Sequence, residues 1–308
     1  MRRLLFAIPI LAFCIQAGAQ AQVKLERKRP EGPVVTRATT KMHQVLTIAG
    51  QNVETNVEAE ERTRATASKP AADGSIRVEE KTESVKLNLD TPAGKLEFDS
   101  TKPAASKNEN PMLDAIQNAM KARVGKSYTY VFGPDGKVKA VEGTEKVIQS
   151  APGDVQEILK QELDPERLKR RLNQDLALLP EKAVNKGDRW QRTVTMDIGA
   201  GQTLTFTEYL EYQGTVEKDG KTLDKISVYT GEVKYDLDPN SPLPVKVTHS
   251  DLKIDSSSGT VLFDRESGQI VENSGAVRIV GPMTFSVNGM ELPGKLDLTI
   301  DMSSALAR

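Results

Sequence analysis

Residues 53–60 read VETNVEAE, in which valine, threonine and alanine alternate with acidic and amide side chains. Successive side chains of a β-strand point to opposite faces of a sheet, so this alternation gives one apolar face and one wet face. The same two-residue period recurs within 76–89 and 204–212. One wet face is typical of antiparallel sheets. The stretch therefore predicts antiparallel β structure, and its recurrence extends that prediction over most of the chain.

Two β-rich stretches, 34–143 and 181–308, flank a helical connector at 144–180. Acidic-Gly and Ser-Gly turns separate the expected strands, as in hairpins. The two stretches share a strand–turn–strand plan, which leaves a true duplication and a chance likeness equally open. The fold class that these patterns predict is α+β, mainly β. We expect one or more large curved antiparallel sheets, either an open half-barrel or a duplicated meander, with a few helices between the two halves.

Helices are expected at residues 111–124 and 154–179. Asn110 can cap the first helix with Pro111 at its first position, and Asp164 with Pro165 begins a second segment of the other. An apolar leucine stripe follows, and the opposite face carries Arg167, Lys169, Arg170 and Arg171. We interpret this cluster as a solvated helix face, in preference to a phosphate or lipid-headgroup patch, because single charge runs are weak evidence.

The first nineteen residues predict export. Arg2 and Arg3 precede an apolar run, and the small residues 17–19 follow it, which is the pattern of a secretory signal peptide cleaved near Ala19. Cys14, the one cysteine, lies inside this run, so the mature chain has no disulfide. Residues 20–33 are polar and basic and are expected to form a flexible lead-in. The expected location is the periplasm or the cell exterior, with no transmembrane segment in the mature chain.

The composition and motifs favour a protein that is not an enzyme. Forty-two basic residues balance forty-three acidic ones, and aromatic residues make up 5%, so nucleic acid is not an expected partner. The two histidines, His43 and His249, lack metal-ligand spacing, and the sequence predicts no metal or cofactor. Neither a nucleophile elbow nor a distinguished carboxylate pair is present, and no catalytic residue is assigned.

The candidate ligand contacts are apolar residues expected on the inner face of a curved sheet. Trp190, the one tryptophan, is expected to start a strand with its ring in the core, and it joins the set because tryptophan often anchors interfaces. The full set comprises Leu204, Phe206, Leu210, Tyr212, Tyr128, Tyr130 and Trp190.

Three motifs carry a family resemblance: residues 95–100 (KLEFDS), residues 133–138 (GPDGKV), and Leu179-Pro180 followed by residues 186–190 (KGDRW). With them the chain resembles a bacterial exported family, the domain of unknown function 6263. The resemblance implies export and an undetermined role, and it brings no catalytic residues. The layout is also similar to the open half-barrels of periplasmic lipoprotein carriers, at the level of fold alone.

Two functions follow as hypotheses. The first is a non-enzymatic binding or structural module of the cell envelope that holds a hydrophobic small molecule, a lipid or a partner segment on a concave sheet. The alternative is a periplasmic hydrolase that uses carboxylates, which requires two acids of shifted pKa in one cleft.

Overall fold

The computed structural model describes residues 22–103, 107–199, 201–238, 241, 245–287 and 289–307. The predicted signal peptide and Cys14 lie outside these residues. The elements are β1 (Val34–Ile48), β2 (Gln51–Ala67), β3 (Ile76–Thr91), β4 (Gly94–Asp99), α1 (Pro111–Arg123), β5 (Ser127–Phe132), β6 (Val138–Glu142), α2 (Thr144–Gln149), α3 (Gly153–Glu162), α4 (Pro165–Leu176), β7 (Arg189–Gly199), β8 (Gln202–Lys218), β9 (Lys221–Leu237), β10 (Val245–Ser250), β11 (Lys253–Asp264), β12 (Gln269–Val287) and β13 (Met290–Leu306).

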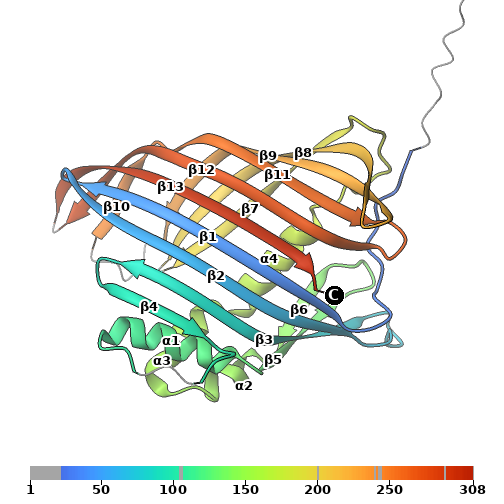
Figure 1. Cartoon of the computed structure of the whole chain (residues 1–308), viewed down its shortest axis with the longest axis horizontal. Helices are drawn as coiled ribbons and strands as arrows, with labels where there is room; N and C mark the ends of the chain where they lie inside the picture. Colours follow the sequence, from blue (N-terminus) through green and yellow to red (C-terminus); the bar gives the residue numbers. More distant parts are fainter. Residues whose placement is uncertain are drawn as a thin grey trace, which may run out of the picture.

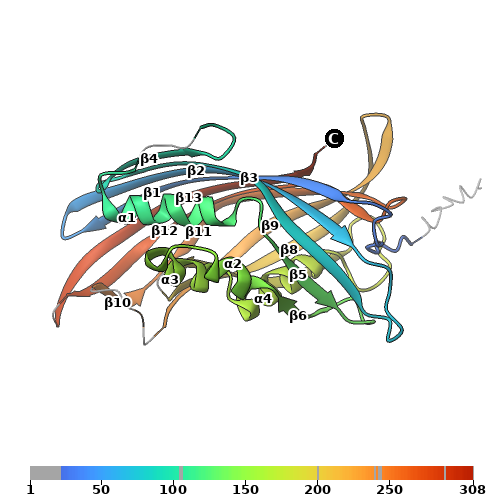
Figure 2. The ribbon, with the colours of Figure 1, turned by 90° about the horizontal axis from the view of Figure 1, so that it is seen from below.

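All strands belong to one curved sheet, and every pair in it is antiparallel (Figure 1). The strand order is β6-β5-β3-β2-β1-β13-β12-β11-β9-β8-β7, with β4 beside β3 and β10 beside β12. Because β1 pairs with β13, the two β-rich stretches join through the first and last strands. The predicted fold class is confirmed: the sheet is curved, antiparallel and unclosed, and the helices lie on its concave side (Figure 2).

Helices α1 and α4 begin where the sequence predicts, whereas α3 begins at Gly153 without a side-chain cap. Asn110 accepts hydrogen bonds from the main-chain N–H groups of Met112 and Leu113, and Asp164 accepts one from Arg167. These caps satisfy N–H groups that a helix leaves without partners. In the described part of the chain, every helix falls short of the length and apolar character that a membrane span requires.

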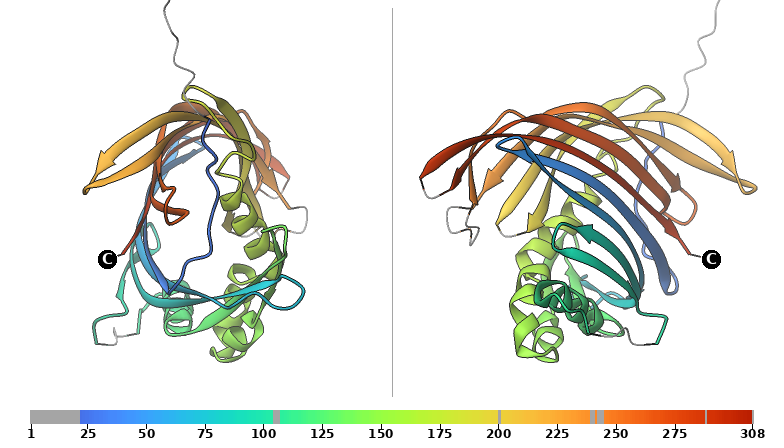
Figure 3. Two further views of the ribbon diagram at one scale, coloured as in Figure 1. Left: turned by 90° about the vertical axis from the view of Figure 1, so that its right-hand side faces the viewer. Right: turned by 60° about the vertical axis from the view of Figure 1, so that its left-hand side comes forward.

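Helix α4 fills the gap between the two edge strands of the sheet, β6 and β7 (Figure 3). The Asn173 amide accepts from the N–H of Val138 in β6 at 2.9 Å and donates to its carbonyl at 3.2 Å. In the orientation that matches donors to acceptors, the Gln174 amide accepts from the N–H of Thr195 in β7 at 3.1 Å and donates to its carbonyl at 3.3 Å. Two consecutive side chains therefore imitate strand pairing on both edges, and sheet and helix together form a ring.

The arginine-rich side of α4 differs from the solvated face that the sequence predicted. Arg167 and Arg170 donate to the carboxylate of Asp197 on β7 at 2.9 and 3.0 Å, which fixes the helix to that edge. Arg171 faces the inside of the ring, near Tyr128 and Tyr130. The helix bridges two strands, so its charges contact protein on more than one side, a circumstance that a single helical pattern does not reveal.

The segment at residues 22–33, here called the N-terminal strap, crosses one end of the ring (Figure 3, left). Val23 exchanges two main-chain hydrogen bonds with Val184, at 2.9 and 2.8 Å, and Leu25 is 2% exposed. The strap then passes directly over Gly268, where a Cβ would collide with the main chain of Lys28. The sequence predicted a flexible lead-in over residues 20–33, whereas main-chain pairing at Val23 and the buried Leu25 side chain attach this part of the strap to the ring.

Leu25 tests how strongly the strap is held. We expect Leu25→Ala to lower the free energy of unfolding by about 2–4 kcal/mol, because the side chain leaves a cavity among well-packed neighbours. Glu26→Ala, at the exposed neighbouring position, is the control, with an expected change within about 0.5 kcal/mol. Urea unfolding followed by circular dichroism measures both. Equal stability of the two variants would show that the strap does not contribute to the fold.

Candidate functional site

The inner face of the sheet carries an apolar surface to which eight strands contribute. No helix residue of the described chain belongs to it. Its centre is fully buried, whereas its margin consists of half-buried side chains. We call this surface the apolar lining. Its buried members are Leu204, Phe206, Leu252, Val277, Ile279, Met283, Phe285, Leu296, Leu298 and Ile300, and its half-buried members are Met42, Leu46, Ile48, Met196, Val233, Tyr235, Val247, Ile254 and Leu292.

Charged side chains interrupt the inner face at positions where the alternation calls for apolar residues. Arg192 lies between Trp190 and Val194 on the inward-facing side of β7, and its partner Glu208 occupies the same face of β8. Arg192 Nε donates to Glu208 Oε2 at 2.7 Å, and the two side chains are 11% and 16% exposed. A charge pair held this far from water must compensate its desolvation through good geometry and further hydrogen bonds.

A second group of polar side chains comes from the opposite wall. Tyr128 on β5 donates to Glu80 on β3 at 2.7 Å, and its hydroxyl lies 3.5 Å from that of Tyr130. Arg123, at the end of α1, donates to Glu61 on β2 at 2.8 Å. Strand and helix residues therefore meet inside the ring through charged groups and tyrosine hydroxyls.

Helix α4 supplies the third wall through Arg171 and Asp175, which are one helical turn apart. Both remain exposed although they face the inside of the ring, so solvent reaches this inner surface. Arg27 of the strap donates to the main-chain carbonyl of Asp175 at 3.1 Å, and Arg192 donates to that of Gln174 at 2.9 Å. Cations at these last-turn carbonyls complement the helix dipole. The whole set, here called the polar belt, comprises Arg27, Glu61, Glu80, Arg123, Tyr128, Tyr130, Glu162, Arg171, Asp175, Arg192 and Glu208.

Burial changes the pKa values of acids and tyrosines in the polar belt. It raises the pKa of the Glu80 and Glu162 carboxyl groups above their ordinary values, even though arginines nearby oppose the shift. Burial also raises the pKa of the Tyr128 and Tyr130 hydroxyls, which keeps both as hydrogen-bond donors. The belt thus combines arginines with acids that hold their protons to higher pH than free acids do.

The predicted ligand contacts all face inward, but they fall into three separate clusters. Leu204 and Phe206 belong to the apolar lining. Leu210 and Tyr212 pack with Trp190 against the strap, and the Trp190 ring donates to the Leu178 carbonyl at 3.3 Å. Tyr128 and Tyr130 pack against the helices and take part in the polar belt. Six of the seven are buried, Trp190 is half-buried, and a role in ligand contact stays a prediction.

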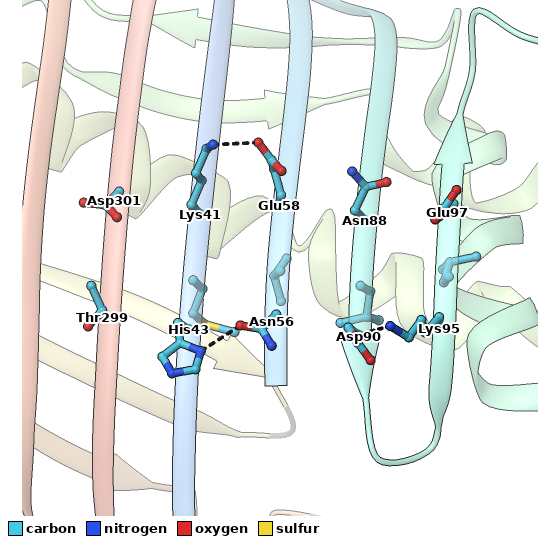
Figure 4. A pocket seen from close by; sticks show the side chains of 14 residues that line it. Lys41, His43, Asn56, Glu58, Asn88, Asp90, Lys95, Glu97, Thr299 and Asp301 are labelled. Carbon is cyan, nitrogen blue, oxygen red and sulfur yellow. Dashed lines mark hydrogen bonds and ion pairs between the residues drawn. The ribbon is translucent and has the colours of Figure 1, made fainter. Parts of the chain in front are cut away.

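The outer face carries a hollow of about 440 Å³ at strands β1–β4 and β13 (Figure 4). Its polar side chains pair with one another: Lys41 lies 2.8 Å from Glu58, Lys95 lies 2.7 Å from Asp90, and His43 Nδ1 lies 2.7 Å from the Asn56 amide. These groups are exposed or half-buried, and they lie on the face of the sheet away from the helices. We place the candidate site on the inner face, because these outer charges are already paired and hydrated.

The two histidines lie on different strands, His43 on β1 and His249 on β10. Among the residues with described positions, no group of three or more histidine, cysteine or acidic side chains could hold a metal ion.

The polar belt was missed from the sequence, although a signal for it exists. Glu61 and Glu80 share the strand parity of inward-facing apolar neighbours, as do Arg192 and Glu208. A charge at an apolar position of an alternating strand marks an inward-facing charge. The belt residues of α1, α3 and α4 have no such signal, because only the folded ring brings them to the strands.

A family of unknown function, DUF6263, matches residues 73–270, well over half of the chain. The chain belongs to DUF6263. The resemblance drawn from the three short motifs, all of which lie within the matched range, is therefore confirmed. The search among curated proteins found no match.

Solved structures offer distant similarities to this DUF6263 protein. A structure titled for lipid–protein interactions in lipovitellin aligns with a TM-score of 0.44 and 11% identity, over 91% of this chain and 25% of that one. DynF, from the dynemicin biosynthesis pathway of Micromonospora chersina, aligns with a TM-score of 0.21 and 9% identity, over 96% of this chain and 92% of that one. OccK5 of Pseudomonas aeruginosa aligns with a TM-score of 0.24 and 8% identity, over 91% of this chain and 99% of that one. The chain spans a quarter of the lipovitellin chain, and scores this low carry no argument about function.

The raised pKa of the Glu80 carboxyl can be tested by measuring how the free energy of unfolding depends on pH. The folded state keeps its proton to higher pH than the unfolded state, whose carboxyl titrates near pH 4.3. Between the two pKa values the folded state binds more protons, so the free energy of unfolding falls as pH rises through that window. Glu80→Gln keeps an acceptor for Tyr128 and should remove this fall, so its stability relative to wild type rises with pH.

Unfolding by urea between pH 4 and pH 8 measures the difference. Glu79→Gln, the exposed neighbour on the outer face, is the matched control and should show no such trend. If the difference in free energy of unfolding between Glu80→Gln and wild type does not change with pH, the burial of this carboxyl is contradicted.

Proposed function

We propose that this DUF6263 protein is an exported, non-enzymatic binding protein of the cell envelope. It holds a hydrophobic small molecule, a lipid or an apolar segment of a partner against the inner face of its sheet. The single observation that carries the proposal is the apolar lining, to which eight strands contribute and which no described helix residue joins.

The lining has buried central side chains and a half-buried margin, and no helix residue of the described chain packs into it. A sheet normally buries its apolar face against helices or another sheet. Here the helices pack with Tyr128, Tyr130 and the inner side chains of β3 and β4, whereas half-buried residues such as Met42, Val233 and Tyr235 keep part of their surface open. Covering apolar surface gains roughly 25 cal/mol per Å². A ligand on the lining would supply the missing contact.

The hydrolase alternative has one observation in its favour. Burial raises the pKa of Glu80 and Glu162, two acids of the same belt. Each is engaged, however: Glu80 accepts from Tyr128, and Glu162 lies 3.6 Å from Arg123. Acids held in this way serve to join the walls of the ring, so we favour binding over catalysis.

Export belongs to the same proposal and rests on the signal-peptide pattern. We expect the chain to begin at about Gln20 when it is recovered from the periplasm or the medium, because a peptidase cleaves after small residues. Cell fractionation followed by mass spectrometry of the N-terminal peptide measures this. A chain that keeps Met1 and stays in the cytosol would contradict export.

Binding is tested with two neighbouring substitutions on β9. Val233 is half-buried in the lining, and Lys234 is exposed on the opposite face. We expect Val233→Gln to weaken binding of a fluorescent apolar probe by about tenfold, since a buried polar group without a partner costs about 1–3 kcal/mol. Lys234→Gln should leave binding unchanged. Equal probe affinity for both variants, or no probe binding to wild type, would contradict the proposal.

A further inference from the structure

The outer hollow at strands β1–β4 and β13 is lined by two rows of polar side chains (Figure 4). Within a row, each residue lies directly opposite the next one on the neighbouring strand, so the sheet register fixes both rows. With about 4.8 Å between strands, a row that crosses from β13 to β4 extends on the order of 19 Å, which suits an extended ligand. One row is Asp301, Lys41, Glu58, Asn88 and Glu97, and the other is Thr299, His43, Asn56, Asp90 and Lys95.

Side-chain length explains why the sheet is hollowed at this point. Asn56 on β2 and Asn88 on β3 are short side chains near the centre of the rows. Lys41 on β1, and Lys95 and Glu97 on β4, are long and form rims on the two sides. The resulting space of about 440 Å³ lies within the size range of small-ligand sites.

The charges of the hollow are held in pairs. Lys41 Nζ lies 2.8 Å from Glu58, and Lys95 Nζ lies 2.7 Å from Asp90. A charged ligand would have to compete with these pairs for the same groups. A neutral ligand can leave them intact, because an ammonium group has three N–H donors and a carboxylate has several acceptor sites. The pairs therefore offer donors and acceptors at fixed positions.

Four further side chains of the hollow have hydrogen-bonding capacity to spare. In the part of the chain that the structure describes, none of the four makes a side-chain hydrogen bond to another protein group, and each is exposed or half-buried. An amide, a hydroxyl and two carboxylates are thus available to a ligand. These side chains are Asn88, Thr299, Glu97 and Asp301.

We propose that the outer hollow binds a neutral oligosaccharide whose hydroxyl groups bridge the two polar rows. A hydroxyl donates one hydrogen bond and accepts up to two, so it can meet a carboxylate, an ammonium group or an amide equally well. Hydrogen bonds to the charged groups are the stronger ones. Four carboxylates and two ammonium groups line the hollow, and this surplus of acids disfavours an anionic sugar. The inference goes beyond the proposed function and concerns the opposite face of the sheet.

The experiment titrates the full mature chain with four trisaccharides in a calorimeter. Maltotriose and triacetylchitotriose are neutral, chitotriose is cationic, and trigalacturonate is anionic. We expect at least one neutral trisaccharide to bind, and to bind more tightly than either charged one. Asn88→Leu should weaken that binding about tenfold, because the amide loses its hydrogen bonds to the sugar. Thr299→Val should weaken it about threefold through the loss of one hydroxyl.

Gln191→Leu is the matched control. It makes the same amide-to-leucine change at an exposed position on the outer face of β7, the far edge strand of the sheet, and should alter no affinity by more than about twofold. Urea unfolding at the wild-type midpoint shows that each variant still folds.

Three results would overturn the inference: no binding of either neutral trisaccharide, equal affinity of Asn88→Leu and Gln191→Leu for the sugar, or a charged trisaccharide that binds as tightly as the neutral ones. None of these results bears on the proposed function, because the apolar probe and the Val233→Gln variant test the inner face separately.

Discussion

The ring depends on how the two edge strands of one large sheet find hydrogen-bond partners. An edge strand presents unpaired N–H and C=O groups, which proteins must cover or otherwise protect. In this protein β6 and β7 are those edges, and α4 lies between them. Asn173 and Gln174 each offer a carbonyl and an amino group to the main chain of one edge. Adjacent residues of a helix point about 100° apart, so two consecutive amides can serve strands on two sides.

The ring explains why charged groups lie on its inner surface. Once α4 occupies the gap, its third side faces inward, and Arg171 and Asp175 project there together. Acids from β2, β3 and β8 meet arginines from α1, α4 and β7. These contacts join parts of the wall that share no strand ladder. Arg171 and Asp175 are exposed, whereas Arg192 and Glu208 are only 11% and 16% exposed.

The inner face changes character along its length. The strap and the residues around Trp190 close one end with a packed core that includes Leu25, Leu178 and Leu179. The polar belt follows, and beyond it lies the apolar lining, to which no described helix residue belongs. The outer face shows no such gradient at its hollow, where opposite charges lie side by side and neutralise one another.

The sequence by itself determined the β content, the antiparallel pairing, the helix starts at Asn110 and Asp164, and the family. Alternation, turn residues and caps are local properties, and local properties are legible in a linear pattern. Only the tertiary structure decided that the strap is ordered, that α4 joins β6 to β7, and that Arg171 faces the inside of the ring. Each of these depends on residues more than twenty positions apart in the chain, whose contacts arise from the curvature of the sheet and from the unpaired backbone of its edges.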